Sequence, residues 1–452
     1  MARCPTSTGA GAAAEMDSAP RRWRLCSALV SGSAAFLLAC SPGPSPDILL
    51  LTLDTTRSDA VGAFGGARAR TPRLDALAGE ALRFTQAITT APYTGPSHAS
   101  MHTGLLPPQH GLRDFLQQAL PEQAVTLAES LRSRGYQTAA FVSAYVLDPR
   151  YGLDQGFDVY SSVRQPRGHE SFTERPAVDT VDEVLRWVRE RDVSRPFFLW
   201  IHLFDPHHPY RPPEEFRRPL PAGIGRLERQ CARYLDEAAY MDAEIGRALD
   251  EFDRIGLLEN LVIVAVADHG EMIGERGYRP GTHSPVLFDL TLRVPLFVRA
   301  PGRVDPGAED RQVSVVDVFP TILELAGLAV PEGIEGRSLL REASSPRPAY
   351  SETFYEHHPG RAEVGQELVS LRLDGWKLIT GPGRSELYDL RSDPNEERDV
   401  SSQHPQQVER LRAVLIALAK RWPEEAVPRA LELDPAEVER HLDRLRSLGY
   451  VE

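Results

Sequence analysis

Cysteine is scarce in this chain, with four cysteines in 452 residues, at positions 4, 26, 40 and 231. So few cysteines, so widely separated, exclude a small fold held together by a network of disulfides. Burial of apolar side chains must stabilise the fold instead, and a composition of 42% hydrophobic and 25% charged residues is typical of a globular protein. The length fits one large domain with an appendage.

Positive charge is also in deficit, because 51 Lys and Arg residues face 64 Asp and Glu residues and the formal net charge is -13. This balance disfavours nucleic acid as a partner. It would also repel an anionic substrate, unless bound cations reverse the field at the site. The composition therefore predicts metal ions wherever the chain handles an anion.

The apolar stretch near the N-terminus is too short to cross a membrane. The basic cluster Arg21-Arg22-Trp23-Arg24 precedes about fifteen mostly apolar or small residues, 25–39, which is the pattern of an export signal rather than a spanning helix. We therefore interpret residues 1–39 as a signal peptide, with Met16 as an alternative start.

The signal ends in Leu37-Leu38-Ala39-Cys40, which resembles a bacterial lipoprotein box, and a Pro/Ser/Gly tether follows it. We expect residues 40–46 to be a lipidated Cys40 and a linker. The protein would then be an exported lipoprotein on the periplasmic face of the inner membrane or in the outer membrane. The alternative is an ordinary signal peptide with an incidental cysteine.

Apolar strand-like runs alternate with amphipathic helix-like segments over residues 47–345. Strands are predicted at 47–53, 137–142, 197–201, 261–267 and 294–298, and helices near 72–81, 125–134, 178–190 and 229–254. This alternation predicts an α/β fold with a doubly wound, mainly parallel central sheet flanked by helices. Residues 346–422 predict a smaller C-terminal α+β subdomain, with strands at 368–373, 376–380 and 386–389 and a helix near 405–420. Residues 423–452 predict a helical tail.

Acidic residues and histidines gather where the predicted strands end. Asp54, Asp205 and Asp268 each follow such a run, and seven of the thirteen histidines lie in or beside these loops, at positions 98, 102, 202, 207, 208, 269 and 283. Ligands bind outside the carboxyl ends of strands in sheets of this class. A set of histidines and carboxylates suits zinc, manganese or a similar divalent ion.

Thr94 lies in the stretch Pro92-Tyr-Thr-Gly-Pro-Ser-His-Ala-Ser-Met-His-Thr-Gly104. Pro96 suits the first position of a helix and Gly104 suits its end, so Thr94 is predicted at the mouth of a short helix. The unpaired N–H groups of a helix N-terminus favour a tetrahedral anion beside Thr94. A plain helix cap is the alternative role for this threonine.

Several ordered motifs resemble the sulfatase family of the alkaline-phosphatase superfamily, over roughly residues 46 to 420. The matching segments are Leu53-Asp-Thr-Thr-Arg-Ser-Asp59, Thr71-Pro-Arg-Leu-Asp-Ala-Leu-Ala78, the Thr94 to Gly104 stretch, Asp268-His269-Gly270, Leu292-Arg-Val-Pro-Leu-Phe-Val298 and Glu386-Leu-Tyr-Asp-Leu390. The resemblance implies a hydrolase of phosphoric or sulfuric esters.

Departures from the family pattern bear on the substrate. Sulfatases carry a Cys or Ser, converted to formylglycine, where this chain has Thr94, and an Arg where it has His98. Asp54-Thr55 replaces paired aspartates, and Val142-Ser-Ala-Tyr145 replaces a Gly-Lys-x-His element. The remaining pattern resembles the phosphodiesterases and phosphotransferases of the superfamily, which use an unmodified Thr or Ser.

The resemblance also implies two divalent ions, zinc or manganese, with calcium or magnesium as alternatives. One ion would be held by Asp54, Asp268, His269 and the nucleophile Thr94. The other would be held by Asp205, His283 and either His207 or His208, of which His207 fits the family's His-x-Pro-Tyr better. His98, His202 and His208 are left as candidate substrate-binding residues.

Three functions remain in competition. The favoured one is metal-dependent cleavage of a phosphate ester, most readily a diester, through Thr94. The second is sulfuric ester hydrolysis without formylglycine. The third is a non-catalytic, metal-binding surface lipoprotein. The substrate would be a small-molecule, glycan-borne or lipid-borne anionic ester, and the sequence leaves the oligomeric state open.

Overall fold

The computed structural model describes residues 45–114, 118–163, 174–342, 346–353, 367–422, 429–430, 439–440 and 443. The predicted signal peptide, Cys40 and most of the predicted tail helix therefore lie outside the described residues. The described part of the chain contains no helix that is long and apolar enough to span a membrane.

The core of the protein is an eight-stranded sheet in the order β5-β4-β6-β1-β7-β8-β2-β9. Its strands are β1 (Ile48–Leu53), β2 (Leu82–Ile88), β4 (Gln137–Phe141), β5 (Val159–Ser161), β6 (Phe197–Leu203), β7 (Val262–Ala267), β8 (Arg293–Arg299) and β9 (Gly307–Ser314). All pairs are parallel except those of β8 with β7 and β2. The sheet is thus mixed and mainly parallel, as predicted.

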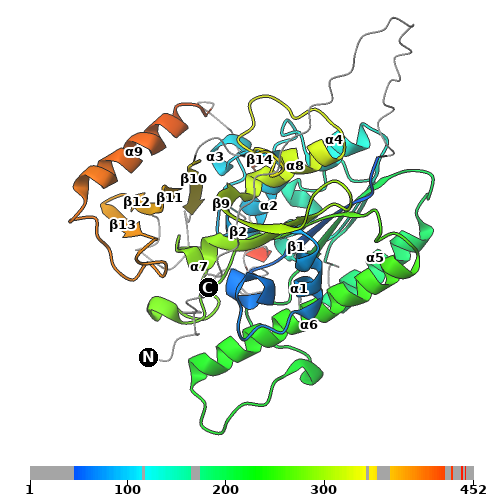
Figure 1. Ribbon diagram of the computed structural model, residues 1–452, viewed down its shortest axis with the longest axis horizontal. Coiled ribbons are helices and arrows are strands. Elements are labelled where there is room, and N and C mark those ends of the chain that lie inside the picture. The colour runs from blue at the N-terminus through cyan, green and yellow to red at the C-terminus, as the bar shows by residue number, and fades with distance from the viewer. Residues whose placement is uncertain are drawn as a thin grey trace, which may run out of the picture.

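The central strands are continuous apolar runs because both faces of the sheet are covered. Every residue of β1, β6 and β7 is buried. One face is covered by α1 (Pro72–Gly79), α5 (Ala177–Glu190) and α6 (Arg226–Arg254), and the other by α2 (Thr94–Thr103), α3 (Pro107–His110), α4 (Leu127–Arg132) and α8 (Val318–Leu325) (Figure 1). A short helix, α7 (Asp289–Leu292), leads into β8.

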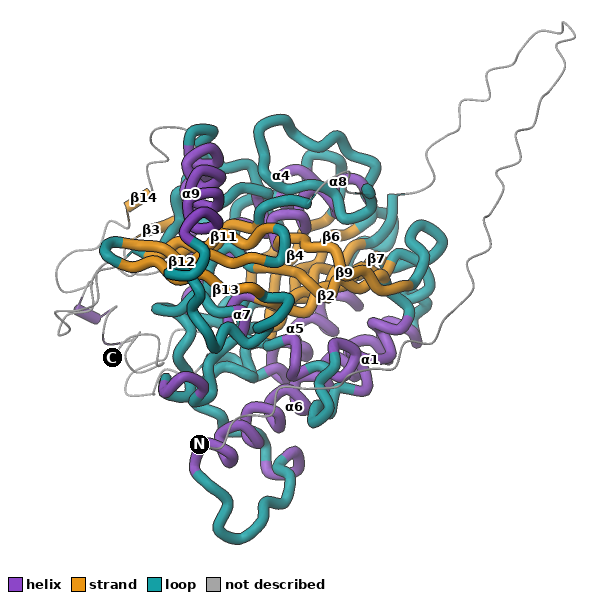
Figure 2. Tube along the Cα trace, turned by 60° about the vertical axis from the view of Figure 1, so that its left-hand side comes forward, coloured by secondary structure: helices purple, strands orange, loops and turns teal. Residues whose placement is uncertain are grey.

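A smaller antiparallel sheet follows in the C-terminal part. It comprises β10 (Ala349–Thr353), β11 (Leu368–Leu373), β12 (Trp376–Gly381) and β13 (Arg384–Asp389), in that order, and α9 (Pro405–Ala419) packs on it (Figure 2). A two-stranded sheet pairs β3 (Gln118–Ala119) with β14 (Arg429–Ala430). The predicted α+β subdomain is therefore present.

A buried ion network joins the small sheet to the main body. Lys377 on β12, of which 1% of the side chain is exposed, lies 2.7 Å from Asp289 Oδ1 on α7 and 2.7 Å from Glu396 Oε1. Arg372 on β11 contacts the other oxygen of Asp289 at 2.7 Å. The two cations hold the pKa of the Asp289 carboxyl well below its usual range, against the effect of burial.

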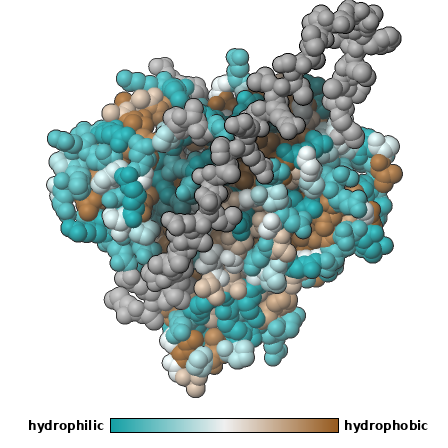
Figure 3. Space-filling model, viewed as in Figure 1, coloured by the Kyte–Doolittle hydropathy of each residue, from teal (hydrophilic) through white to brown (hydrophobic). Residues whose placement is uncertain are grey.

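The surface carries few large apolar side chains. Figure 3 shows a mainly hydrophilic face with scattered hydrophobic residues. Among the described residues, the exposed large hydrophobic side chains are Val125, Val159, Val178, Val193 and Ile416. Cys231 is buried in an apolar cluster with Tyr210, Tyr234, Leu235 and Ile273, and the described fold depends on its apolar core.

Candidate active site

Adjacent parallel strands bring Asp54 and Asp268 together. Leu53 at the end of β1 is in register with Ala267 at the end of β7, so the residues that follow emerge side by side. Asp268 Oδ1 accepts hydrogen bonds from the backbone N–H of Thr55 at 3.1 Å and of His269 at 2.7 Å. Its other oxygen, Oδ2, is buried and accepts no hydrogen bond from the described residues.

Thr94 is the first residue of α2 and lies at the same edge of the sheet as Asp268 and His269. Its Oγ1 is 3.5 Å from His269 Nε2, and the residue is 3% exposed. The helix begins two residues earlier than Pro96 suggested, because Tyr93 supplies the extended residue before the first turn. It ends as predicted at Gly104, whose φ of 71° suits glycine.

Asp54, Asp268 and His269 form one group that fits a cation, because their candidate ligand atoms all lie within 4.8 Å of one another. Burial and the neighbouring charges of Asp268, Glu174 and Glu271 raise the pKa of Asp54 well above its usual value. Burial raises the pKa of Asp268 to about 6. Two buried carboxylates so close together are costly unless a positive charge offsets them.

A second group contains His207, Glu271 and His283, again with ligand atoms within 4.8 Å of one another. The two groups are neighbours, since the rings of His269 and His283 stack with centroids 4.6 Å apart. Glu271 was missed in the sequence, although it directly follows Asp268-His269-Gly270. Burial raises its pKa to about 8, and Tyr210 donates a hydrogen bond to Oε2.

Three histidines present the correct nitrogen for metal binding. The Nδ1 atoms of His207, His269 and His283 face the backbone carbonyls of His208, Gly270 and Pro92 at 2.5, 3.0 and 2.8 Å. A carbonyl only accepts hydrogen bonds, so Nδ1 carries the proton and Nε2 carries the lone pair. This arrangement is the one found around metal-ligating histidines.

Asp205, predicted as a ligand, does not join the second group. Its Oδ1 accepts a hydrogen bond from the backbone N–H of Ala177 at 3.0 Å, at the start of α5. Burial raises the pKa of Asp205 to about 7. The structure thus places Glu271, and not Asp205, beside His207 and His283.

Of the two adjacent histidines, the structure favours His207 as the ligand. The ring of His207 lies 5.5 Å from that of His283. The ring of His208 packs edge-on against Tyr210, is half-buried, and belongs to neither group. Its backbone N–H lies 3.5 Å from Glu271 Oε1.

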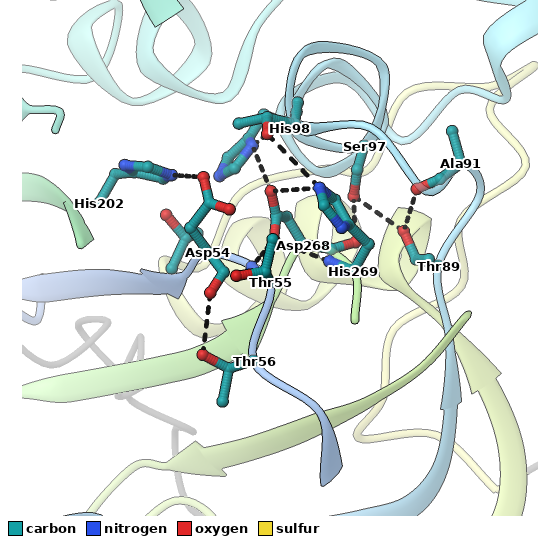
Figure 4. Close-up of polar contacts among 12 residues, drawn as sticks. Asp54, Thr55, Thr56, Thr89, Ala91, Ser97, His98, His202, Asp268 and His269 are labelled. Carbon is teal, nitrogen blue, oxygen red and sulfur yellow. Dashed lines mark hydrogen bonds and ion pairs between the residues drawn. The ribbon is translucent and has the colours of Figure 1, made fainter. Parts of the chain in front are cut away.

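His98 and His202 are fully buried, as are the candidate ligands Asp54, Asp268 and His269. His202 Nδ1 accepts a hydrogen bond from Ser143 N at 3.3 Å, so Nε2 carries the proton and donates it to Asp54 Oδ2 at 3.1 Å (Figure 4). His98 Nδ1 donates to Thr94 O at 2.7 Å. Burial lowers the pKa of both rings. These contacts favour a role in orienting Asp54 and Thr94 over direct contact with substrate.

His98, His202 and Asp268 form a third close group of possible ligands. The hydrogen bonds of His202 commit both of its ring nitrogens, one as acceptor and one as donor. His102, on the same helix as His98, packs against Trp200 with the rings tilted and their centroids 4.3 Å apart, and burial lowers its pKa to about 3. It belongs to the apolar support of the site.

Comparison with known proteins identifies the family of this chain. Residues 46–328 match the family model described as Sulfatase, and residues 282–421 match N-sulphoglucosamine sulphohydrolase, C-terminal. The chain belongs to the sulfatase family. It is an ester hydrolase of the alkaline-phosphatase superfamily, as the motifs predicted.

Relatives in the sulfatase family span most of the chain. An arylsulfatase of Clostridium perfringens is 24% identical over 456 residues, covering 82% of this chain and 94% of the relative. An ulvan-active sulfatase of Formosa agariphila is 29% identical over 345 residues, covering 67% of this chain and 66% of the relative.

Two solved structures show the same fold. BT4656, in complex with its substrate D-glucosamine-2-N,6-O-disulfate, has a TM-score of 0.73 and 20% identity, covering 86% of this chain and 100% of that one. The phosphonate monoester hydrolase of Agrobacterium radiobacter has a TM-score of 0.70 and 22% identity, covering 85% of this chain and 99% of that one.

Proposed function

We propose that the protein is a metal-dependent hydrolase that cleaves phosphate esters, diesters ahead of monoesters, through Thr94 as nucleophile. The proposal is supported chiefly by the position of Thr94, the first residue of α2. Its Oγ1 lies 3.5 Å from Nε2 of His269, which belongs to the group of Asp54, Asp268 and His269. A hydroxyl so placed could share the cation that this group holds.

The two groups would each hold one divalent ion. Asp54, Asp268, His269 and Thr94 would hold the first, and His207, Glu271 and His283 the second. Bound ions would lower the pKa of the Thr94 hydroxyl and offset charge on the attacking and leaving oxygens. The role predicted for Asp205 passes to Glu271 in this proposal.

The reaction has two steps. Thr94 Oγ1 gives up its proton to water and attacks phosphorus, the Oγ1–P bond forms, and the bond from phosphorus to the leaving oxygen breaks. The leaving oxygen departs with the electron pair and takes a proton from water. Water then attacks phosphorus, the Oγ1–P bond breaks, and Thr94 recovers its proton.

His98 supports the preference for diesters. It stands where sulfatases carry an arginine, and burial keeps it neutral by lowering its pKa. The site therefore carries less fixed positive charge for a phosphate dianion. Tight contact of His98 with Thr94 O instead fixes the first turn of α2.

Sulfuric ester hydrolysis is the second candidate, favoured by the sulfatases among the relatives. A threonine ester of sulfate has no second hydroxyl to expel the product, as the formylglycine hydrate has, so external water would have to release it. A non-catalytic metal-binding protein would retain the ligands without turnover.

Parallel assays separate these functions. Purified protein is analysed for metal and tested on an aryl sulfate, a phosphate monoester and a phosphate diester, beside Thr94→Ala and the control Thr103→Ala. Thr103 ends the same helix, and its hydroxyl donates to Ala99 O at 2.7 Å and accepts from Leu105 N at 3.3 Å. We expect diester hydrolysis that Thr94→Ala loses and Thr103→Ala keeps. A preference for aryl sulfate would favour the second function, and bound metal without turnover the third.

A further inference from the structure

The residue after Asp54 has an unusual backbone conformation. Thr55 has a φ of 47°, in the left-handed region, and is fully buried. A β-branched residue rarely adopts this conformation, because its side chain crowds the backbone. The surrounding structure must therefore hold Thr55 in place.

The strained turn has a direct consequence for the ligand group. It aims the backbone N–H of Thr55 at Asp268 Oδ1, 3.1 Å away. That bond, with the one from His269 N, occupies Oδ1 and leaves Oδ2 facing His98 and His269 (Figure 4). Thr55 thus sets which oxygen of Asp268 is free for a cation.

One side chain holds both ends of this turn. The hydroxyl of Tyr234, on α6, donates to Thr55 O at 2.9 Å and accepts from Arg57 N at 2.8 Å. The hydroxyl thus uses its one proton for Thr55 O and accepts one hydrogen bond from Arg57 N. Because Tyr234 is only 1% exposed, water does not compete for these two hydrogen bonds.

The far end of the turn is anchored independently. The Arg57 guanidinium is bound to Asp59 by two bonds of 2.8 and 2.6 Å and to Glu275 at 2.7 Å. Tyr234 therefore links the backbone of Arg57, which its ion pairs hold in place, to the backbone of Thr55, which has the strained conformation. The ring of Tyr234 is supported in turn by Tyr210, with centroids 5.5 Å apart.

We propose that Tyr234 is a positioning residue for the cation group, which acts by holding Thr55 in its left-handed conformation so that Asp268 is presented with Oδ2 free. This inference rests on the cation site proposed above. It predicts that loss of the hydroxyl weakens metal binding through the backbone of residue 55.

The test is a titration with Zn²⁺ of the full chain in a His283→Ala background, which removes a ligand of the second group. We expect Tyr234→Phe to weaken Zn²⁺ binding about tenfold, as removal of support around a metal ligand does. The control is Tyr160→Phe. Tyr160 lies on the edge strand β5, and its hydroxyl donates to Leu147 O at 2.7 Å. This variant should bind Zn²⁺ as tightly as the His283→Ala background protein.

A rescue separates this role from general destabilisation. Glycine adopts a positive φ without strain, so Thr55→Gly added to Tyr234→Phe should recover most of the lost affinity while keeping the N–H that bonds Asp268. Unchanged affinity in Tyr234→Phe, or failure of Thr55→Gly to recover it in a folded protein, would overturn the inference. Absence of Zn²⁺ binding in the background protein would overturn the proposed cation site as well.

Discussion

Replacement of Asp268 by asparagine distinguishes two effects of this carboxylate: its burial destabilises the metal-free protein, and its binding to a metal ion would stabilise the metal-bound protein. Asparagine keeps an oxygen that accepts from Thr55 N and His269 N, so the loop geometry is preserved. It removes the negative charge from the other atom. Metal-free and metal-bound stability should therefore change in opposite directions.

The metal-free effect follows from the pKa. Burial raises the pKa of Asp268 to about 6, so the folded protein binds this proton more tightly than the unfolded chain. The free energy of unfolding therefore falls as the pH rises from the unfolded pKa of Asp268 through about 6. At pH 7.5 the buried carboxylate is ionised and destabilises the metal-free protein to its full extent. Asparagine avoids a cost of roughly 1–3 kcal/mol, at about 1.4 kcal/mol per pKa unit.

The metal-bound effect has the opposite sign. At a free Zn²⁺ concentration of about 100 times Kd, binding stabilises the native protein by about 2.7 kcal/mol. Asp268→Asn should lose most of that gain. Urea unfolding at pH 7.5, in a chelator and in Zn²⁺, measures both differences on the same two proteins.

Asp242 supplies a control for the effect of Zn²⁺. Its carboxylate is also buried, accepts backbone bonds from Arg73 at 3.1 Å and Leu74 at 2.7 Å, and has a pKa raised by burial to about 6. The two bonds fall on different oxygens of Asp242, so Asp242→Asn loses one of them and should not be stabilised in chelator, but it should keep the full gain from Zn²⁺. If Asp268→Asn gained as much from Zn²⁺ as the wild type, Asp268 would not be a ligand.

Two other buried charges and the N-terminal Cys40 offer separate tests. Burial and nearby Asp205 raise the pKa of Glu237 to about 9, so the free energy that this carboxyl costs the folded protein grows as the pH rises from its unfolded pKa. In urea unfolding, Glu237→Gln should be roughly 1–3 kcal/mol more stable than wild type at pH 8 and equally stable at pH 4. Equal stability at pH 8 would contradict this. Lys377→Met leaves Asp289 and Glu396 short of a buried cation and should cost about 3–5 kcal/mol without changing Zn²⁺ affinity; a loss below about 1 kcal/mol would show that Arg372 suffices. Cys40→Ser should move the protein from the membrane to the soluble fraction, and unchanged fractionation would argue against a lipid anchor at Cys40.

The sequence was sufficient to predict the central strands and the proximity of Asp54, Asp268 and His269. Apolar runs such as β1 and β7 are visible because both faces of the sheet are covered, and each ends in an aspartate. It was not sufficient for β2, which the sequence pattern did not predict. The segment LRFTQAI is only partly buried and shifts register against both neighbours, so its pattern carries no clear period.

The second group shows where sequence reasoning failed in detail. Asp205 and Glu271 both follow strands that end near the site, and a motif cannot tell which carboxylate turns toward His283. The turn after Asp205 directs its side chain to the N-terminus of α5 instead. The protonation of His202 is likewise set by Ser143 N, a contact across 59 residues that spacing does not encode.

The covalent step at Thr94 tests the central proposal most directly. The wild-type protein is loaded with Zn²⁺ or Mn²⁺, mixed with a phosphate diester, quenched in acid during turnover and digested for mass spectrometry. The account predicts a phosphoryl ester on Thr94 that retains one alcohol group of the diester and is absent from Thr94→Ala. Turnover by Thr94→Ala at the wild-type rate, with residue 94 unmodified in the wild type, would contradict it.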